Sequence, residues 1–250
     1  MTIQTRQMVK ALVRRVSSLP FQVAPEGRLK FMLRSAVAAT MARVPPEFLV
    51  NRGETVVIIG FHRIDSVMLW SDLVGKRGRV VLIEAVPDYV QNIKTNLEHH
   101  LNWPLQNILY VNRAVAAARG TCRIQIGKRA DFNKLAGQSI DDGLSAADFV
   151  QGVEVQADTI DQILADNGID TVDHVHMTVS GMELEALRGM PRTLQQPALR
   201  VHIRSLHSKD GQLLYPQVVE LLEQHGMQVS VGRASGRFKG RDIYGVKLPR

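Results

Sequence analysis

Apolar and polar positions follow two alternating patterns from residue 55 onward. Short apolar runs, typical of buried strands, are separated by segments whose apolar residues recur at helical spacing. The apolar runs predict strands over residues 55–59, 79–84, 108–112, 122–126, 153–156, 174–179, 199–203, 228–231 and 243–247. The helical spacing predicts helices over residues 65–73, 87–99, 159–165, 183–188 and 216–225. This alternation predicts an α/β domain with a mostly parallel sheet, helices on both faces and an antiparallel closing strand.

Two segments depart from this alternation. Residues 127–152 are dominated by Gly, Ser, Asp and Ala, so we expect a loop there that could serve as a lid. Before residue 50, two amphipathic stretches are separated by Pro25-Glu26-Gly27, and their apolar residues recur at helical spacing. We therefore predict a basic helical N-terminal extension over residues 1–50 and an α/β domain over residues 51–250.

Charge is distributed unevenly along the chain. The first 50 residues hold eight Lys and Arg against Glu26 and Glu47, and residues 233–250 hold six against Asp242. The formal net charge of +7 therefore divides into +6, −4 and +5 for the N-terminal, middle and C-terminal parts. Basic ends of this kind favour contact with an anionic surface, either phospholipid headgroups or an acidic protein partner. Nucleic acid is not expected as a partner, because the sequence has no recognition motif or aromatic-interleaved basic patch.

The N-terminal extension has three interpretations. Its helices could pack on the domain or on another chain, lie on an anionic membrane surface, or form a cleaved organelle presequence, since no acid precedes Glu26. We expect a cytoplasmic protein, peripheral at a membrane under the second interpretation and targeted to mitochondria under the third. No apolar run approaches the roughly 20 residues that span a bilayer. The lone Cys122 excludes a disulfide framework and a Cys-based zinc site.

Candidate chemistry begins between residues 55 and 84. An apolar strand leads into Gly60, an amphipathic helix follows, and a second apolar strand ends on Glu84. This order is typical of nucleotide-binding βαβ units, in which an acid at the end of the second strand accepts hydrogen bonds from ribose hydroxyls. Phe61, His62 and Arg63 are bulky where small residues normally let the backbone approach a ligand.

Several motifs occur in an order that matches a known family. Val56-Val57-Ile58-Ile59-Gly60-Phe61-His62-Arg63-Ile64 is similar to V-V-D-V-G-A-N-I-G, and Glu84-Ala85-Val86-Pro87 is similar to E-P-x-P. Asn96-Leu97, Leu101-Asn102 and Ile160-Asp161 match shorter family segments. The stretch from Val175 to Gly189 is similar to I-K-I-D-V-E-G-A-E-x-x-V-L-R-G. From about Val50 to about Leu206 the chain therefore resembles the FkbM-type family of S-adenosylmethionine-dependent methyltransferases.

The resemblance implies a Rossmann-like class I methyltransferase fold with S-adenosylmethionine as cofactor. It also implies O-methylation of a hydroxyl on a sugar or another small molecule. The residues that it points to for cofactor binding are Gly60, His62, Glu84, Asn112 and Ser180. The candidates for catalysis are His176, His202 and Glu183, of which Glu183 matches the last acid of the family motif.

Polar residues alternate along one of the predicted strands. His174, His176, Thr178 and Ser180 would all point to the same side of the sheet, next to His202 on the neighbouring strand. The imidazoles could form a metal site, His176 or His202 could act as a general base, or the residues could be hydrogen-bonded and structural. We assign no metal site, because no carboxylate is placed to complete a ligand set.

The departures from the family pattern fall where chemistry is expected. Ile58, Thr178 and Ser180 replace acids, and Ile64 replaces a glycine. Ile58 offers no hydrogen bond, and a β-branched Ile64 suits poorly a turn that needs positive φ. Two hypotheses therefore stay open. The chain is either an active O-methyltransferase with an altered cofactor loop, or a catalytically inactive protein of methyltransferase fold that serves as a scaffold or complex subunit.

Overall fold

The computed structural model describes residue 48 and residues 50–60, 64–100, 106–128, 133–137, 145–232 and 241–248. The helices expected in the N-terminal extension, the bulky segment 61–63 and the basic residues 233–240 lie outside the described residues. Phe48 and Val50, at the end of the extension, are buried at 4% and 7% exposure.

A seven-stranded sheet forms the centre of the domain, in the order β12-β13-β9-β8-β1-β2-β3. Its strands are β1 (Thr55–Ile59), β2 (Arg79–Glu84), β3 (Ile108–Asn112), β8 (His174–Met177), β9 (Arg200–Ser205), β12 (Gln228–Val231) and β13 (Arg241–Val246). Neighbours among β1, β2, β3, β8 and β9 pair in parallel, whereas β13 runs antiparallel to both β9 and β12. This arrangement confirms the mostly parallel sheet with an antiparallel closing strand.

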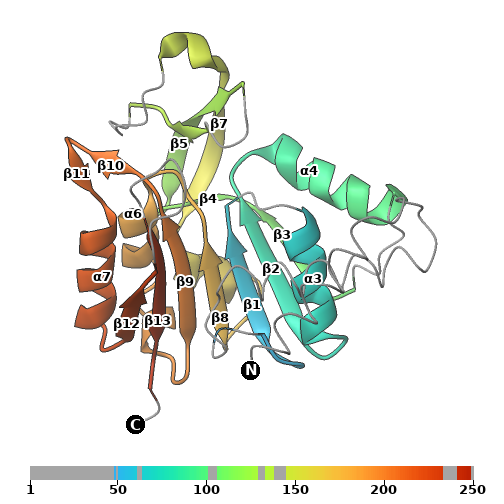
Figure 1. The fold of residues 1–250 in the computed structure, drawn as a ribbon. Coiled ribbons are helices and arrows are strands. Elements are labelled where there is room, and N and C mark those ends of the chain that lie inside the picture. Colours follow the sequence, from blue (N-terminus) through green and yellow to red (C-terminus); the bar gives the residue numbers. More distant parts are fainter. Residues whose placement is uncertain are drawn as a thin grey trace, which may run out of the picture.

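Helices cover both faces of this sheet (Figure 1). On one face lie α3 (Ile64–Val74) and α4 (Pro87–Thr95), and on the other α5 (Ile160–Asp166), α6 (Glu183–Arg188) and α7 (Tyr215–Gln224). Within β1, Val56 and Ile58 belong to the core cluster on the α3 and α4 face, and Val57 and Ile59 to the cluster on the opposite face. Successive side chains of a strand point to opposite faces, so a central strand covered on both sides is apolar throughout.

Short elements complete the described chain. A π-helical turn, η2 (Asn96–His100), continues α4 and takes up the end of the predicted helix 87–99. The 3-10 turn η5 (Thr193–Gln195) precedes β9, and the hairpin of β10 (Ser208–Lys209) and β11 (Gln212–Leu213) precedes α7. In the part of the chain that the structure describes, no helix is long and apolar enough to cross a membrane.

A second sheet corrects part of the prediction of a loop over residues 127–152, of which residues 129–132 and 138–144 lie outside the described residues. Its order is β4 (Ala114–Val115), β7 (Phe149–Asp158), β5 (Gly120–Gly127) and β6 (Lys134–Leu135), with the 3-10 turn η4 (Ala146–Asp148) before β7. It rises above the carboxyl ends of the parallel strands in Figure 1. Strands β5 and β7 bury few side chains, so polar residues continue along them and an apolar pattern does not reveal their full length.

Candidate functional site

The carboxyl ends of β1, β2 and β3 bring three predicted site residues to one edge of the sheet. Gly60 follows β1, Glu84 ends β2, and Asn112 ends β3 directly opposite Glu84 in the β2–β3 register. Neighbouring parallel strands end at the same edge, and ligands of open α/β sheets bind there. His62 belongs to this loop region but lies outside the described residues.

Glu84 is held rigidly at this edge. Its side chain is buried with 5% exposure, and its Oε1 accepts a hydrogen bond of 2.8 Å from the backbone N–H of Val86. The Asn112 amide donates to the carbonyls of Glu84 and Ala85, both at 2.9 Å. The backbone N–H of Arg113 also reaches the Glu84 carbonyl at 3.2 Å. The bond from Val86 orients the Glu84 carboxylate, and the bonds from Asn112 and Arg113 hold the backbone that carries it.

Gly60 allows a close approach between two strand ends. Its φ is +88°, and a Cβ added there would lie 1.9 Å from the carbonyl oxygen of Thr178. Its N–H donates to Ile83 at 3.0 Å, and the Thr178 N–H donates to Ile59 at 2.9 Å. Only glycine fits this position, because any side chain would meet both unfavourable φ and backbone atoms.

Ile58 changes what this edge can hold. The family places an acid at this position, but Ile58 is fully buried in the cluster that packs against Val67 and Met68 of α3. An aliphatic side chain there supplies packing and no charge or hydrogen bond. Ile64, which replaces a family glycine, begins α3, so the structure requires no positive-φ turn at that position.

His176 and His202 lie side by side, as predicted, but within a row of rings on the α3 face of the sheet. They occupy paired positions of β8 and β9, with ring centroids 4.6 Å apart. Trp70 contacts His176 at 4.8 Å, and Tyr244 stacks on His202 at 4.5 Å with an angle of 11°. Exposures of 4% for His176 and 9% for His202 place both rings in the interior, before the ends of their strands.

Asp242 is a partner of His202 that the sequence analysis missed. Its Oδ1 lies 3.1 Å from His202 Nε2 and 3.6 Å from Arg204 Nε. Burial acts to raise the pKa of Asp242, but the hydrogen bond with His202 and the charges of His202 and Arg204 outweigh it, so the pKa is lowered. The contact depends on the register that pairs β13 with β9, and no local sequence signal specifies that register.

His174 lies two residues before His176 on β8, so both side chains are on the same face of the sheet. Phe48 and Trp70 approach its ring at 6.1 and 6.0 Å between centroids. Burial, followed by the nearby Arg200 and His202, lowers the pKa of His174 to about 3, so this ring is neutral at pH 7. A neutral, fully buried ring among aromatic side chains fits a structural role.

Thr178 and Ser180 correct the prediction of a strand over residues 174–179. The strand β8 ends at Met177, and the chain then turns, with the Gly181 N–H donating to the Val179 carbonyl at 2.9 Å. Both side chains therefore follow the sheet instead of alternating within it. Ser180 is partly exposed beside Gly181, whose φ of +77° lets the chain turn into α6.

Glu183 is fully buried at the first residue of α6. Burial raises the pKa of its carboxyl group to about 8, against the smaller opposing effect of the backbone N–H groups of Glu183 and Gly181. Neither carboxyl oxygen has a well-formed hydrogen bond within the described residues. Glu183 is therefore protonated at pH 7, and its side chain has no exposed surface.

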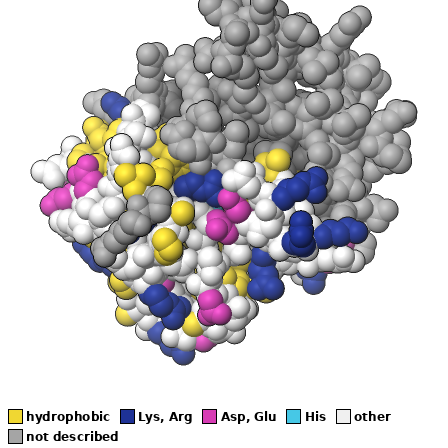
Figure 2. Space-filling model, turned by 90° about the horizontal axis from the view of Figure 1, so that it is seen from below, with side chains coloured by type: hydrophobic (Ala, Val, Ile, Leu, Met, Phe, Trp, Pro, Cys, Tyr) yellow, Lys and Arg dark blue, Asp and Glu magenta, His cyan; other side chains and the backbone are white. Residues whose placement is uncertain are grey.

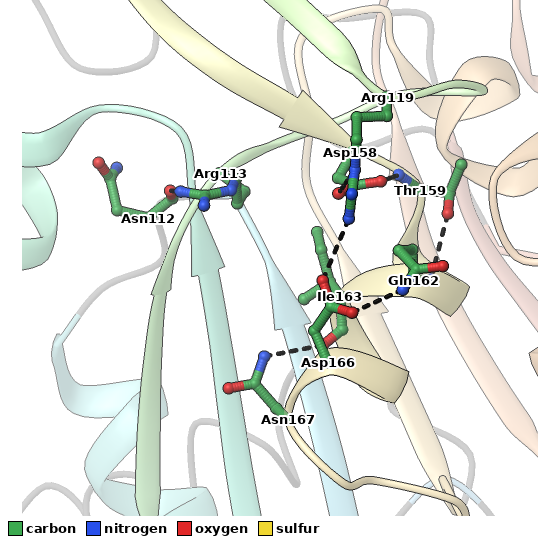
Figure 3. A network of polar contacts seen from close by, with 9 residues as sticks. All are labelled: Asn112, Arg113, Arg119, Asp158, Thr159, Gln162, Ile163, Asp166 and Asn167. Carbon is green, nitrogen blue, oxygen red and sulfur yellow. Dashed lines mark hydrogen bonds and ion pairs between the residues drawn. The ribbon is translucent and has the colours of Figure 1, made fainter.

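An ion-pair network braces the chain beyond β3 (Figure 3). Asp158, at the end of β7, accepts from Arg119 Nε at 2.7 Å and from the Thr159 N–H at 2.9 Å. Arg119 also reaches Asp166 of α5 at 3.2 Å. Asp158 is buried whereas Arg119 is 65% exposed, so the pair ties the turn before β5 to the start of α5.

Asp161, which matches the Leu-Asp segment of the family, also has a structural role. Its carboxylate accepts hydrogen bonds from the Arg192 N–H at 2.7 Å, the Thr193 N–H at 3.0 Å and the Thr193 hydroxyl at 2.6 Å. The side chain thus fixes the start of η5 to the first turn of α5. Within the described residues, no group of three or more His, Cys, Asp and Glu could hold a metal ion.

Solved structures with similar folds include three methyltransferase-fold proteins. An FkbM methyltransferase from Methylobacillus flagellatus KT is 14% identical, with a TM-score of 0.54 over 97% of this chain and 59% of that chain. Fibrillarin from Aeropyrum pernix, in complex with natively bound S-adenosyl-L-methionine, is 13% identical, with a TM-score of 0.51 over 84% and 74%. The fibrillarin pre-rRNA processing protein of Methanococcus jannaschii is also 13% identical, with a TM-score of 0.52 over 86% and 75%.

These identities show the fold alone, which is that of class I methyltransferases. This chain spans 59% of the length of the Methylobacillus protein. No curated protein matches the sequence. The family profile described as Methyltransferase FkbM domain matches residues 50–229, well over half of the chain. The chain therefore belongs to the FkbM methyltransferase family.

Proposed function

We propose that this chain binds S-adenosylmethionine at the carboxyl edge of its sheet and transfers the methyl group to a hydroxyl of a small molecule or sugar. The observation that carries the proposal is Glu84, a buried carboxylate at the end of β2 that accepts a hydrogen bond from the Val86 N–H, on backbone that Asn112 holds in place. A carboxylate in this position suits the two ribose hydroxyls of a nucleoside. Membership of the FkbM family supports the same cofactor.

The residues present fit one end of the cofactor better than the other. Glu84, a buried carboxylate at a strand end, suits the nucleoside. Ile58 leaves the methionine amino group without the acid that the family supplies at that position. When bound, the cofactor would supply an electrophilic sulfonium methyl group. The chain would then contribute chiefly alignment, since holding two groups in reactive geometry accounts for a large part of such a rate enhancement.

Proton removal from the acceptor is the least specified step. Glu183 holds its proton at neutral pH and has no exposed surface, so it fits a positioning role beneath the β8–α6 turn. The His202 imidazole is hydrogen-bonded to the Asp242 carboxylate, but its ring lies in the stacked row. We therefore propose that catalysis depends mainly on orienting the acceptor hydroxyl toward the methyl group, with His202 as the candidate base.

A second candidate function is that of a subunit or scaffold without catalysis. It is favoured by a specific set of changes, in which Ile58 is buried in the core and Thr178 and Ser180 stand where the family has acids. These changes remove charge from the candidate cofactor edge while Gly60, Gly181 and Gly189 keep the turns of the fold.

The two functions are separated by turnover. The purified full-length chain would be incubated with S-adenosylmethionine and panels of sugar, phenolic and alcohol acceptors, and S-adenosylhomocysteine would be quantified by mass spectrometry. The first proposal expects acceptor-dependent product, reduced in Glu84→Ala and retained in Glu223→Ala, which removes an exposed carboxylate from α7. No product from any acceptor, together with no cofactor binding, would leave the scaffold function as the better account.

A further inference from the structure

Four cationic side chains gather on the side of the sheet opposite the candidate site. We call Arg52, Lys76, Arg77 and Arg79 the amino-edge patch. They are all exposed, and they come from the turns that lead into β1 and β2. Seen from below, Lys and Arg side chains in dark blue lie together on this part of the surface (Figure 2).

The patch stands on a rigid base. The N–H of Gly53 donates to Val74 at 2.8 Å, and the N–H of Arg79 donates to Glu54 at 3.0 Å, so the two turns are joined by backbone hydrogen bonds. The Asn107 amide also donates to Ser71 and Gly75, at 2.8 and 3.0 Å. The four cations are therefore held near one another by the fold, and their approach does not depend on a ligand.

The charge of the patch is not neutralised locally. Within the described residues, none of its four side chains has an ion-pair partner, and Glu54, two residues after Arg52, is already paired with Arg200. The Glu54 carboxylate bonds to Arg200 at 2.6 Å and to the backbone and side chain of Asn51, both at 2.8 Å. Four unpaired cations on adjoining turns give a local field that favours an anionic surface.

We propose that the amino-edge patch, together with the basic N-terminal extension, docks the protein on an anionic phospholipid surface. The first 50 residues carry a net charge of +6 and two apolar stripes, and Arg52 follows them closely in the sequence. Basic charge combined with an amphipathic apolar stripe suits a lipid interface, whereas nucleic acid binding would use the charge and leave the stripe without a role.

Docking by this patch leaves the candidate site open. The five-residue strand β1 separates the amino edge from the carboxyl edge by about 17 Å. A membrane bound at the amino edge therefore faces away from Gly60, Glu84 and Asn112. The proposal does not depend on the proposed methyl transfer, because charge and position alone carry it.

Vesicle sedimentation tests the proposal with the full-length chain. Wild-type protein is mixed with phosphatidylcholine vesicles containing about 30% phosphatidylserine, and separately with pure phosphatidylcholine vesicles, at low and high salt. Lys76→Glu/Arg77→Glu is compared with Lys94→Glu/Lys209→Glu, which makes the same charge change at exposed positions on α4 and β10. Circular dichroism verifies that each variant is folded.

We expect wild type to bind the anionic vesicles, with binding lost as salt screens the charges. Lys76→Glu/Arg77→Glu should lower the partition coefficient by at least about tenfold, because each basic residue near an anionic surface contributes substantially to the attraction. The control variant should stay within about twofold of wild type. Equal binding to both vesicle types, equal losses in both variants, or tighter binding to an oligonucleotide than to vesicles at the same salt would overturn the proposal.

Discussion

Replacing Gly60 by alanine tests the strand-end geometry on which the candidate site depends. In this structure a Cβ at Gly60 would lie 1.9 Å from the Thr178 oxygen, and Cβ atoms essentially never approach another heavy atom within 3.0 Å. The Thr178 carbonyl would therefore have to move by about 1.1 Å. That movement would disturb the hydrogen bond of 2.9 Å from Thr178 to Ile59, which joins β8 to β1.

The expected loss of stability has two parts. Holding an alanine at a φ of +88° costs about 1–2 kcal/mol. Forcing a methyl group against backbone costs a further 1–3 kcal/mol or so, including a weakened hydrogen bond of about 1 kcal/mol. We therefore expect Gly60→Ala to lower the free energy of unfolding by about 2–5 kcal/mol.

Gly53→Ala is a matched control. Gly53 has a φ of +87°, but a Cβ added there would have no heavy atom within 4 Å. This variant should lose only the conformational part, about 1–2 kcal/mol. Urea unfolding followed by circular dichroism gives both values from the shift in midpoint at constant m. If the two alanine variants are equally destabilised, the close approach of Gly60 to Thr178 does not exist as described.

Two further predictions concern carboxyl groups in the first turns of α6 and α5. Because burial raises the pKa of Glu183 from 4.5 to about 8, the stability that its neutral form provides falls as pH rises between these values. The free energy of unfolding of Glu183→Gln, measured with urea from pH 5 to 8, should therefore rise relative to that of wild type by up to about 1.4 kcal/mol per pH unit. A difference between the two proteins that does not change with pH would contradict this. Asp161→Ala should lower the free energy of unfolding by about 2–3 kcal/mol, because three hydrogen bonds to Arg192 and Thr193 are lost. The exposed control Asp170→Ala should change it little, and similar losses in both variants would refute the proposed role of Asp161.

The sequence predicts the buried parallel strands well, for a physical reason. β1, β2 and β3 have the predicted bounds, because strands covered by helices on both faces are continuous apolar runs. α6 and β12 are also confirmed residue for residue. Residues 149–152 of β7 were missed, since Val150 and Gln151 are both exposed and this part of the strand has no buried apolar run.

The candidate site was predictable where it depends on chain order. Strand ends at Gly60, Glu84 and Asn112 follow from the βαβ pattern, and they meet because parallel neighbours end together. The partnership of Asp242 with His202 was not predictable, since it depends on the register of strands 40 residues apart. The π-helical turn after α4 likewise has no signal in the apolar periodicity.

Cofactor binding is the most direct test of the central claim. Isothermal titration of the full-length chain with S-adenosylmethionine should give a dissociation constant in the micromolar range, roughly −8 kcal/mol. Glu84→Ala should weaken binding by roughly 1–3 kcal/mol, because charge-assisted hydrogen bonds to the ribose are lost, and Glu223→Ala should bind like wild type. No heat of binding at millimolar cofactor, from wild-type protein shown to be folded, would contradict the assignment of a cofactor site at the carboxyl edge.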